Sequence, residues 1–79
     1  MGFDASNVLG SYTGTSQRTV TVSDCDCFFV IGGSSSSYMP RIDDVVVGSN
    51  SRVMLFVKKG QTLKFQLTSG STCIRYGTK

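Results

Sequence analysis

The sequence contains no histidine, no tryptophan and no glutamate, and it has a single proline. Histidine is the usual general base for serine and cysteine nucleophiles, so the usual form of nucleophilic catalysis is excluded. A zinc site needs about four ligands, usually Cys or His, and the chain has three cysteines. Its aspartates do not match a calcium loop, which requires a later glutamate. We therefore predict that the protein is not an enzyme and that it holds no metal or cofactor.

Long hydrophobic runs and blocks of like charge are also missing. The longest apolar run covers residues 27–33, far short of the roughly 20 residues that a spanning helix needs, so no membrane partner is expected. The net charge of +3 comes from scattered Lys and Arg, which disfavours nucleic acid as the partner. A chain of 79 residues has room for one core. Residues 1–79 are predicted to be a single β domain, with residues 1–10 as an N-terminal arm or a weak first strand.

Alternation of apolar and polar residues is clearest in residues 52–68, RVMLFVKKGQTLKFQLT. In the second half, Leu63, Phe65 and Leu67 alternate with polar side chains, which predicts a strand with one buried face. Gly60 supplies the positive φ that a tight reversal needs. The segment is therefore predicted to form an antiparallel hairpin.

Similar short runs recur along the chain at a spacing of roughly ten residues. Residues 18–23, 24–33 and 41–47 each predict a strand, and residues 72–76 predict the last one. Six to seven short strands at this spacing favour an all-β fold, a small antiparallel sandwich or a jelly-roll-like barrel. The predicted interior residues are Val20, Val22, Phe29, Ile31, Val53, Leu55, Leu63, Phe65, Leu67 and Ile74.

Two of the predicted strands are apolar on both faces. Residues 27–31 (CFFVI) and 53–57 (VMLFV) carry an apolar side chain at every position. When one face is buried inside the domain, the other leaves four large side chains without cover, which is unusual for a monomer. Covering them with a second copy is worth several kcal/mol per chain at about 25 cal/mol per Å². We therefore expect a homo-oligomer whose contacts include Phe28, Val30, Met54 and Phe56.

The three cysteines form an odd set. Cys25 and Cys27 lie two positions apart, on the predicted face of Phe29, so we expect both to be buried thiols. Cys73 is expected on the opposite side of its strand from Ile74, and hence more exposed. A bond from Cys73 to either of the other cysteines is the competing interpretation.

The basic residues suggest a second possible function. Lys58, Lys64 and Arg75 are candidates for lining a single-stranded nucleic-acid groove on a small barrel. Lys58 lies in the predicted tip of the hairpin, where charge commonly serves to keep an edge soluble. No aromatic RNP motif accompanies these cations, so the interpretation that they are ordinary solvent-exposed surface charges is favoured.

Residues 52–76, RVMLFVKKGQTLKFQLTSGSTCIRY, resemble the C-terminal half of small β-sandwich modules in bacteriophage and prophage virion proteins. In those modules a strand ending in V-x-K-G-[DQ]-T leads through a Ser/Gly turn to a final strand at the chain end. The run CFFVIGG with its Gly/Ser loop also resembles the middle of such modules. The matching residues are Val57, Lys59, Gly60, Gln61 and Thr62 for the first element, Ser69, Gly70 and Ser71 for the turn, and Ile74 and Tyr76 for the final strand.

The resemblance implies a tail-fibre, head-fibre or spike-like structural protein located in the virion. Such modules are typically homotrimers that bind a host-surface glycan or another virion protein. The serine-rich loop is then the adaptable receptor-binding surface, and it consists of Ser34, Ser35, Ser36, Ser37 and Tyr38. Two alternatives remain open at this point: a single-stranded nucleic-acid-binding small β-barrel and a free-standing carbohydrate-binding module.

Overall fold

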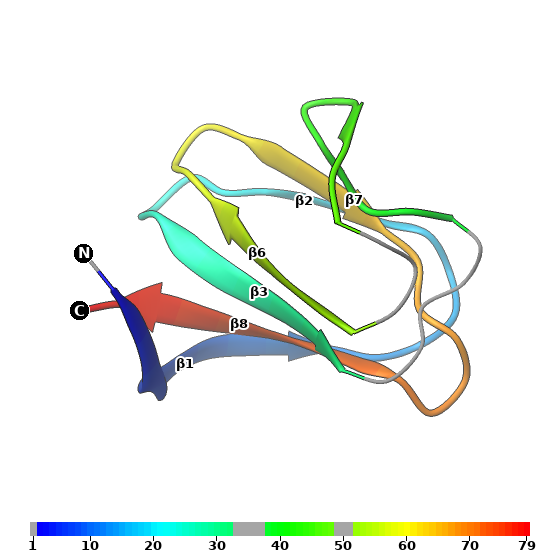
Figure 1. The fold of residues 1–79 in the computed structure, drawn as a ribbon, viewed down its shortest axis with the longest axis horizontal. Helices are drawn as coiled ribbons and strands as arrows, with labels where there is room; N and C mark the ends of the chain where they lie inside the picture. Colours follow the sequence, from blue (N-terminus) through cyan, green and yellow to red (C-terminus); the bar gives the residue numbers. More distant parts are fainter. Residues whose placement is uncertain (1, 33–37, 49–51) are drawn as a thin grey trace.

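Eight β-strands form two four-stranded antiparallel sheets in the computed structural model, which describes residues 2–32, 38–48 and 52–79 (Figure 1). The predicted all-β sandwich is confirmed. Within the described ranges there is no helix, and so none that is long and apolar enough to cross a membrane. The strands are β1 (Phe3–Tyr12), β2 (Arg18–Thr21), β3 (Cys27–Gly32), β4 (Arg41–Ile42), β5 (Val45–Val46), β6 (Val53–Val57), β7 (Thr62–Phe65) and β8 (Thr72–Thr78).

The chain passes from one sheet to the other at almost every connection. The first sheet has the order β1-β8-β3-β6, and the second has the order β2-β7-β4-β5. Only β4 and β5 are consecutive in sequence and paired in the same sheet. Each crossing turns an apolar strand face toward the space between the sheets, which is how a chain this short builds a common core from both sheets.

The predicted hairpin in residues 52–68 is wrong in one respect. The chain does reverse at Gly60, whose φ is 96°, but β6 pairs with β3 while β7 pairs with β2 and β4 in the other sheet. The turn is therefore a crossing between sheets. Alternation specifies which side chains share a face, and here Val57 and Leu63 both reach the core from opposite sheets.

The single strand predicted over residues 41–47 is instead a small hairpin. Arg41–Ile42 and Val45–Val46 pair around a two-residue turn, and both turn residues have positive φ, 50° at Asp43 and 66° at Asp44. Positive φ at both central positions defines a type I′ turn, which accepts Asp more readily than most residues. The two valines of β5 are exposed as a result.

The core lies between the sheets and is almost entirely apolar. Seven of the ten predicted interior residues belong to the buried cluster, and two more, Val20 and Val53, are partly buried and pack against it. Ile74 is the exception to the prediction: it lies opposite Val30 on the outer side of the first sheet, while its neighbour Cys73 lies opposite Ile31 in the core. The buried hydrophobic residues are Val22, Cys27, Phe29, Ile31, Leu55, Val57, Leu63, Phe65, Leu67 and Cys73.

A cavity mutation in this core tests the packing. Leu63 is 0% exposed, and we expect Leu63→Ala to lower the free energy of unfolding by about 2–5 kcal/mol because the sandwich cannot collapse onto the lost volume. Val45 is 63% exposed, so Val45→Ala should cost less than about 0.5 kcal/mol. Urea unfolding of both variants measures the difference, and equal costs would contradict the assignment of the core.

Candidate functional site

The outer surface of the first sheet carries a continuous apolar patch, which we call the aromatic face. Phe28 of β3 lies between Phe56 of β6 and Tyr76 of β8, and the next outward row repeats this order with Val30 at its centre. Because alternate residues of a strand point to opposite faces, β3 and β6 each supply side chains both to the core and to this patch. The aromatic face consists of Phe3, Phe28, Val30, Met54, Phe56, Ile74 and Tyr76.

The rings of the aromatic face contact one another directly. The ring centroids of Phe28 and Phe56 are 4.9 Å apart, and Phe3 meets Phe28 edge-on at 5.6 Å and Tyr76 at 4.9 Å. Edge-to-face and tilted pairs at these separations are favourable, by about 0.5–1.5 kcal/mol each beyond area burial. The rings thus form one rigid surface across all four strands of the first sheet.

Exposure remains substantial in spite of these contacts. Met54 is 52% exposed, and Phe28, Val30 and Phe56 are only partly covered. The four residues predicted from sequence therefore do share one face. Sequence reasoning missed Phe3, an isolated aromatic residue whose position depends on the pairing of β1 with β8, and it placed Ile74 inside.

The outer surface of the second sheet is polar by contrast. Lys64 of β7 lies between Thr19 and Arg41, and the hydroxyl oxygens of Thr21 and Thr62 are 3.0 Å apart. This chemistry suits hydrogen bonding to a ligand rather than burial against an apolar partner.

A shallow pocket of about 280 Å³ opens on this polar side, lined by Asp43, Asp44, Thr62 and Lys64. The backbone N–H of Thr62 donates to Asp43 Oδ1 at 3.0 Å, which fixes the β4–β5 turn against β7. Lys64 Nζ lies 3.2 Å from Asp44 Oδ1. Both carboxylates are thus held in place, and Asp44 and Lys64 both remain accessible from solvent.

The predicted binding loop is only partly observable. Tyr38 is described, and its ring lies 5.3 Å from the guanidinium carbon of Arg41, on the strand that borders the pocket. Ser34, Ser35, Ser36 and Ser37 lie outside the described residues.

The three cations proposed for a nucleic-acid groove do not converge. Lys64 points from the second sheet and pairs with Asp44, whereas Arg75 turns inward from the first sheet to Asp24. Lys58 follows β6 in the turn between the sheets. A groove that follows a phosphate backbone needs its cations along one path, which these three do not form.

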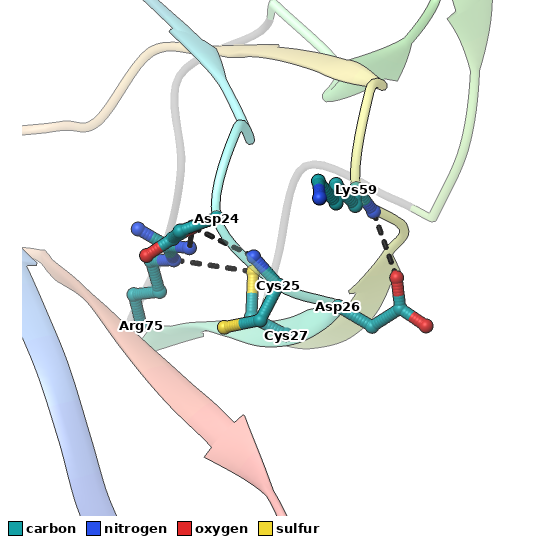
Figure 2. A network of polar contacts seen from close by, with 6 residues as sticks. All are labelled: Asp24, Cys25, Asp26, Cys27, Lys59 and Arg75. Atoms are coloured by element: carbon teal, nitrogen blue, oxygen red, sulfur yellow. Dashed lines mark hydrogen bonds and ion pairs between the residues drawn. The ribbon is translucent and has the colours of Figure 1, made fainter.

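A polar network occupies the turn between β2 and β3 (Figure 2). The guanidinium of Arg75 donates to Asp24 Oδ1 through Nη2 and to Cys27 Sγ through Nε, the latter at 3.2 Å. Its side chain is only 14% exposed and lies over the Phe29 ring. The hydrogen bond from Arg75, together with one from the backbone N–H of Cys25, lowers the pKa of Asp24 below its usual 3.8.

The cysteines are all free, but their placement differs from the prediction. Cys25 is exposed, because β3 begins only at Cys27 and the alternation does not extend back into the turn. Cys27 and Cys73 are both 0% exposed. Burial raises the pKa of Cys73 to about 12 and also raises the pKa of Cys27, where the hydrogen bond from Arg75 opposes the effect. Among the described residues, no three Cys, His, Asp or Glu side chains are grouped as metal ligands.

These features define a β-sandwich with one apolar and one polar outer surface and a thiol-containing turn. Comparisons with protein-family models, with curated proteins and with solved structures found no match.

Acidification tests the link between Asp24 and Arg75. A carboxyl group whose pKa is lowered in the folded state contributes stability above its unfolded pKa, near 3.8, and loses it as the pH falls through the lower folded value. We expect the wild-type protein to be more stable than Asp24→Asn at neutral pH. The difference between their urea midpoints should disappear as the pH falls below about 3.8. Asp44→Asn controls for the loss of one surface charge, and a gap that is independent of pH would contradict the link.

Proposed function

We propose that this chain is a non-enzymatic structural or receptor-binding module of a bacteriophage virion, and that it assembles into a homo-oligomer through the aromatic face. The aromatic face is the observation that carries the proposal. The virion setting and a trimer as the preferred assembly rest on the resemblance of residues 52–76 to virion β-sandwich modules.

The energetics of the aromatic face support the proposed assembly. Apolar burial is worth about 25 cal/mol per Å², so covering this patch yields several kcal/mol per chain. A domain of this size buries only about 60% of the surface of its unfolded chain, so such a gain is comparable to its whole stability. The patch is built on paired strands rather than on a loop, and it therefore needs no ordering before it binds.

A second copy of the chain is the simplest partner for the aromatic face. The outward side chains of β3 and β6, from Phe28 to Val30 and from Met54 to Phe56, carry no charge, so binding requires no partner of opposite charge. Closed symmetric assemblies of identical chains are the commonest oligomers. Such an assembly covers the first sheet of each copy and leaves the polar second sheet in contact with solvent.

The polar surface supplies the receptor-binding half of the proposal. The pocket presents the Asp44 carboxylate and the Lys64 ammonium group near the Tyr38–Arg41 pair. Charged and hydroxyl groups next to an aromatic ring are suited to a polyhydroxylated ligand such as a host-surface glycan. The same pocket is what favours the second candidate, a free-standing carbohydrate-binding module, which differs in having no need to oligomerise.

Size measurements on matched variants test the assembly. At micromolar concentration we expect light scattering to give an oligomer for the wild-type protein and a monomer for Phe56→Ser, because a hydroxyl group within the aromatic face leaves a polar group buried at the contact. Val46→Ser, at an exposed valine of the second sheet, should leave the oligomer intact. If the wild-type protein is a monomer, the proposed homo-oligomer is contradicted, and a free-standing carbohydrate-binding module becomes the better interpretation.

Ligand binding distinguishes the polar pocket from a phosphate-binding surface. On an array of bacterial surface glycans, we expect binding that persists from low to high salt and that falls about tenfold in Asp44→Ala, since hydrogen bonds to charged groups carry it. Asp4→Ala removes an exposed carboxylate from β1 and should bind normally. Steep loss of binding with salt, seen on single-stranded oligonucleotides instead of glycans, would indicate phosphate contacts and reject this assignment.

A further inference from the structure

Two thiols of opposite accessibility lie beside one guanidinium where the turn between β2 and β3 meets β3: Cys25 is in the turn and Cys27 begins the strand. We propose that Cys25 and Cys27 are a hydroperoxide-reactive thiol pair, in which Cys25 is oxidised first and Cys27 then closes an intramolecular disulfide with help from Arg75. This modification site does not depend on the proposed assembly or on the polar pocket.

The difference in exposure assigns the order of reaction. Cys25 is exposed in the turn, so a dissolved oxidant reaches it directly, whereas Cys27 is fully buried at the first position of β3. Oxidation is selective for accessible thiols, so Cys25 is the site of the first step and Cys27 is protected from it. Cys73 is also buried, in β8 opposite Ile31, so it is protected from the first step as well.

The spacing of Cys25 and Cys27 in the sequence keeps the two thiols within reach of each other. Disulfides bridge Cα separations of about 4.4–6.8 Å, and two residues reach at most about 7 Å apart when fully extended. The chain bends at Asp24 and Cys25, just before β3 begins. In Figure 2 both sulfur atoms lie on the side of the turn that faces Arg75.

Arg75 is positioned to promote the second step. Its Nε–H points at Cys27 Sγ at 3.2 Å, so the guanidinium stabilises negative charge on the sulfur that must attack. Asp24 competes for the same guanidinium through Nη2. Burial meanwhile raises the pKa of Cys27, which keeps this thiol protonated and unreactive in the reduced protein.

The chemistry balances with a hydroperoxide as the only oxidant. The Cys25 thiolate attacks the terminal peroxide oxygen: an S–O bond forms, the O–O bond breaks, and the alkoxide leaves as an alcohol (or as water from hydrogen peroxide) after taking up a proton. The Cys27 thiolate then attacks the Cys25 sulfur: the S–S bond forms, the S–O bond breaks, and hydroxide leaves as water with the proton that Cys27 released. The two thiols lose two electrons and two protons, and the peroxide is reduced.

Peptide mapping tests the product directly. Trypsin cleaves after Arg18 and Arg41 and after Lys64 and Arg75, so Cys25 and Cys27 share peptide 19–41 while Cys73 lies in peptide 65–75. Folded protein is treated with hydrogen peroxide, denatured, alkylated and digested. We expect peptide 19–41 to lose two hydrogen atoms and to escape alkylation, and peptide 65–75 to be alkylated. A cross-link between the two peptides, or a sulfinic acid at Cys25 with Cys27 alkylated, would overturn the proposal.

Two substitutions with opposite predicted effects test the role of Arg75. Disulfide closure is timed in competition with dimedone, which captures any Cys25 sulfenic acid that Cys27 has not yet attacked. Arg75→Met should slow closure about tenfold by removing a charged donor to Cys27 Sγ. Asp24→Asn, at an exposed position, should speed closure because the guanidinium then serves the sulfur alone.

The directions of these two rate changes distinguish a chemical role of Arg75 in disulfide closure from a purely structural role in the turn. If the network only braces the turn, both substitutions loosen it and both change the rate in the same direction, and that result would reject the role of Arg75. Arg52→Met, at an exposed arginine before β6, serves as the matched control and should leave the rate unchanged. If circular dichroism shows that Arg75→Met does not fold, Asp24→Asn alone decides the question. A closure rate in Asp24→Asn that equals or falls below the wild-type rate would then reject the role of Arg75.

Discussion

Adjacent side chains of an extended strand point to opposite faces, and β3 and β6 are apolar at every position from Cys27 to Ile31 and from Val53 to Val57. No rotation of such strands leaves only one face apolar. The sandwich satisfies one face of each strand by burying it between the sheets, and it leaves the other face as a surface of contacting rings. The core and the aromatic face are therefore two results of one pattern, and a change that polarises the outer face need not affect the core.

The crossing connections impose a second requirement, because a turn that leaves one sheet for the other loses the regular ladder of hydrogen bonds. The β2–β3 and β6–β7 turns meet this need by bonding to each other. Gly60 N–H donates to the Val22 carbonyl at 2.7 Å, and the Lys59 N–H donates to Asp26 Oδ1 at 2.8 Å. The turn that carries Cys25 is thus braced on one side by the neighbouring turn and on the other by Arg75, which gives its side chains a defined arrangement without regular secondary structure.

Prediction from sequence was most successful where the two-residue alternation of side chains along a strand determines which face a residue occupies. It identified the strands of residues 18–21, 27–32, 53–57, 62–65 and 72–78, four residues of the aromatic face and the reversal at Gly60. It failed where the answer depends on which strands pair. Local sequence favoured a hairpin between β6 and β7, but the partner of β6 is β3, some 25 residues earlier in the chain. Residues 72–76 carry apolar side chains of both parities, so nothing in them decides between Cys73 and Ile74 as the buried residue. The type I′ turn at Asp43 and Asp44 does follow a recognisable preference of Asp for positive φ, and that signal was available.

A single register positions both sites on the first sheet. In the β3–β8 ladder, Phe28 lies opposite Tyr76 and Phe29 lies opposite Arg75. The first pair belongs to the aromatic face, and the second directs the guanidinium inward, over the Phe29 ring and onto Cys27 Sγ. A slip of one residue would exchange the faces, burying the Tyr76 hydroxyl group and moving Arg75 into the apolar patch. The ring contacts of the aromatic face and the ion pair between Arg75 and Asp24 both oppose that slip. The polar network and the aromatic face therefore stabilise the same strand pairing, although they lie on opposite sides of the sheet.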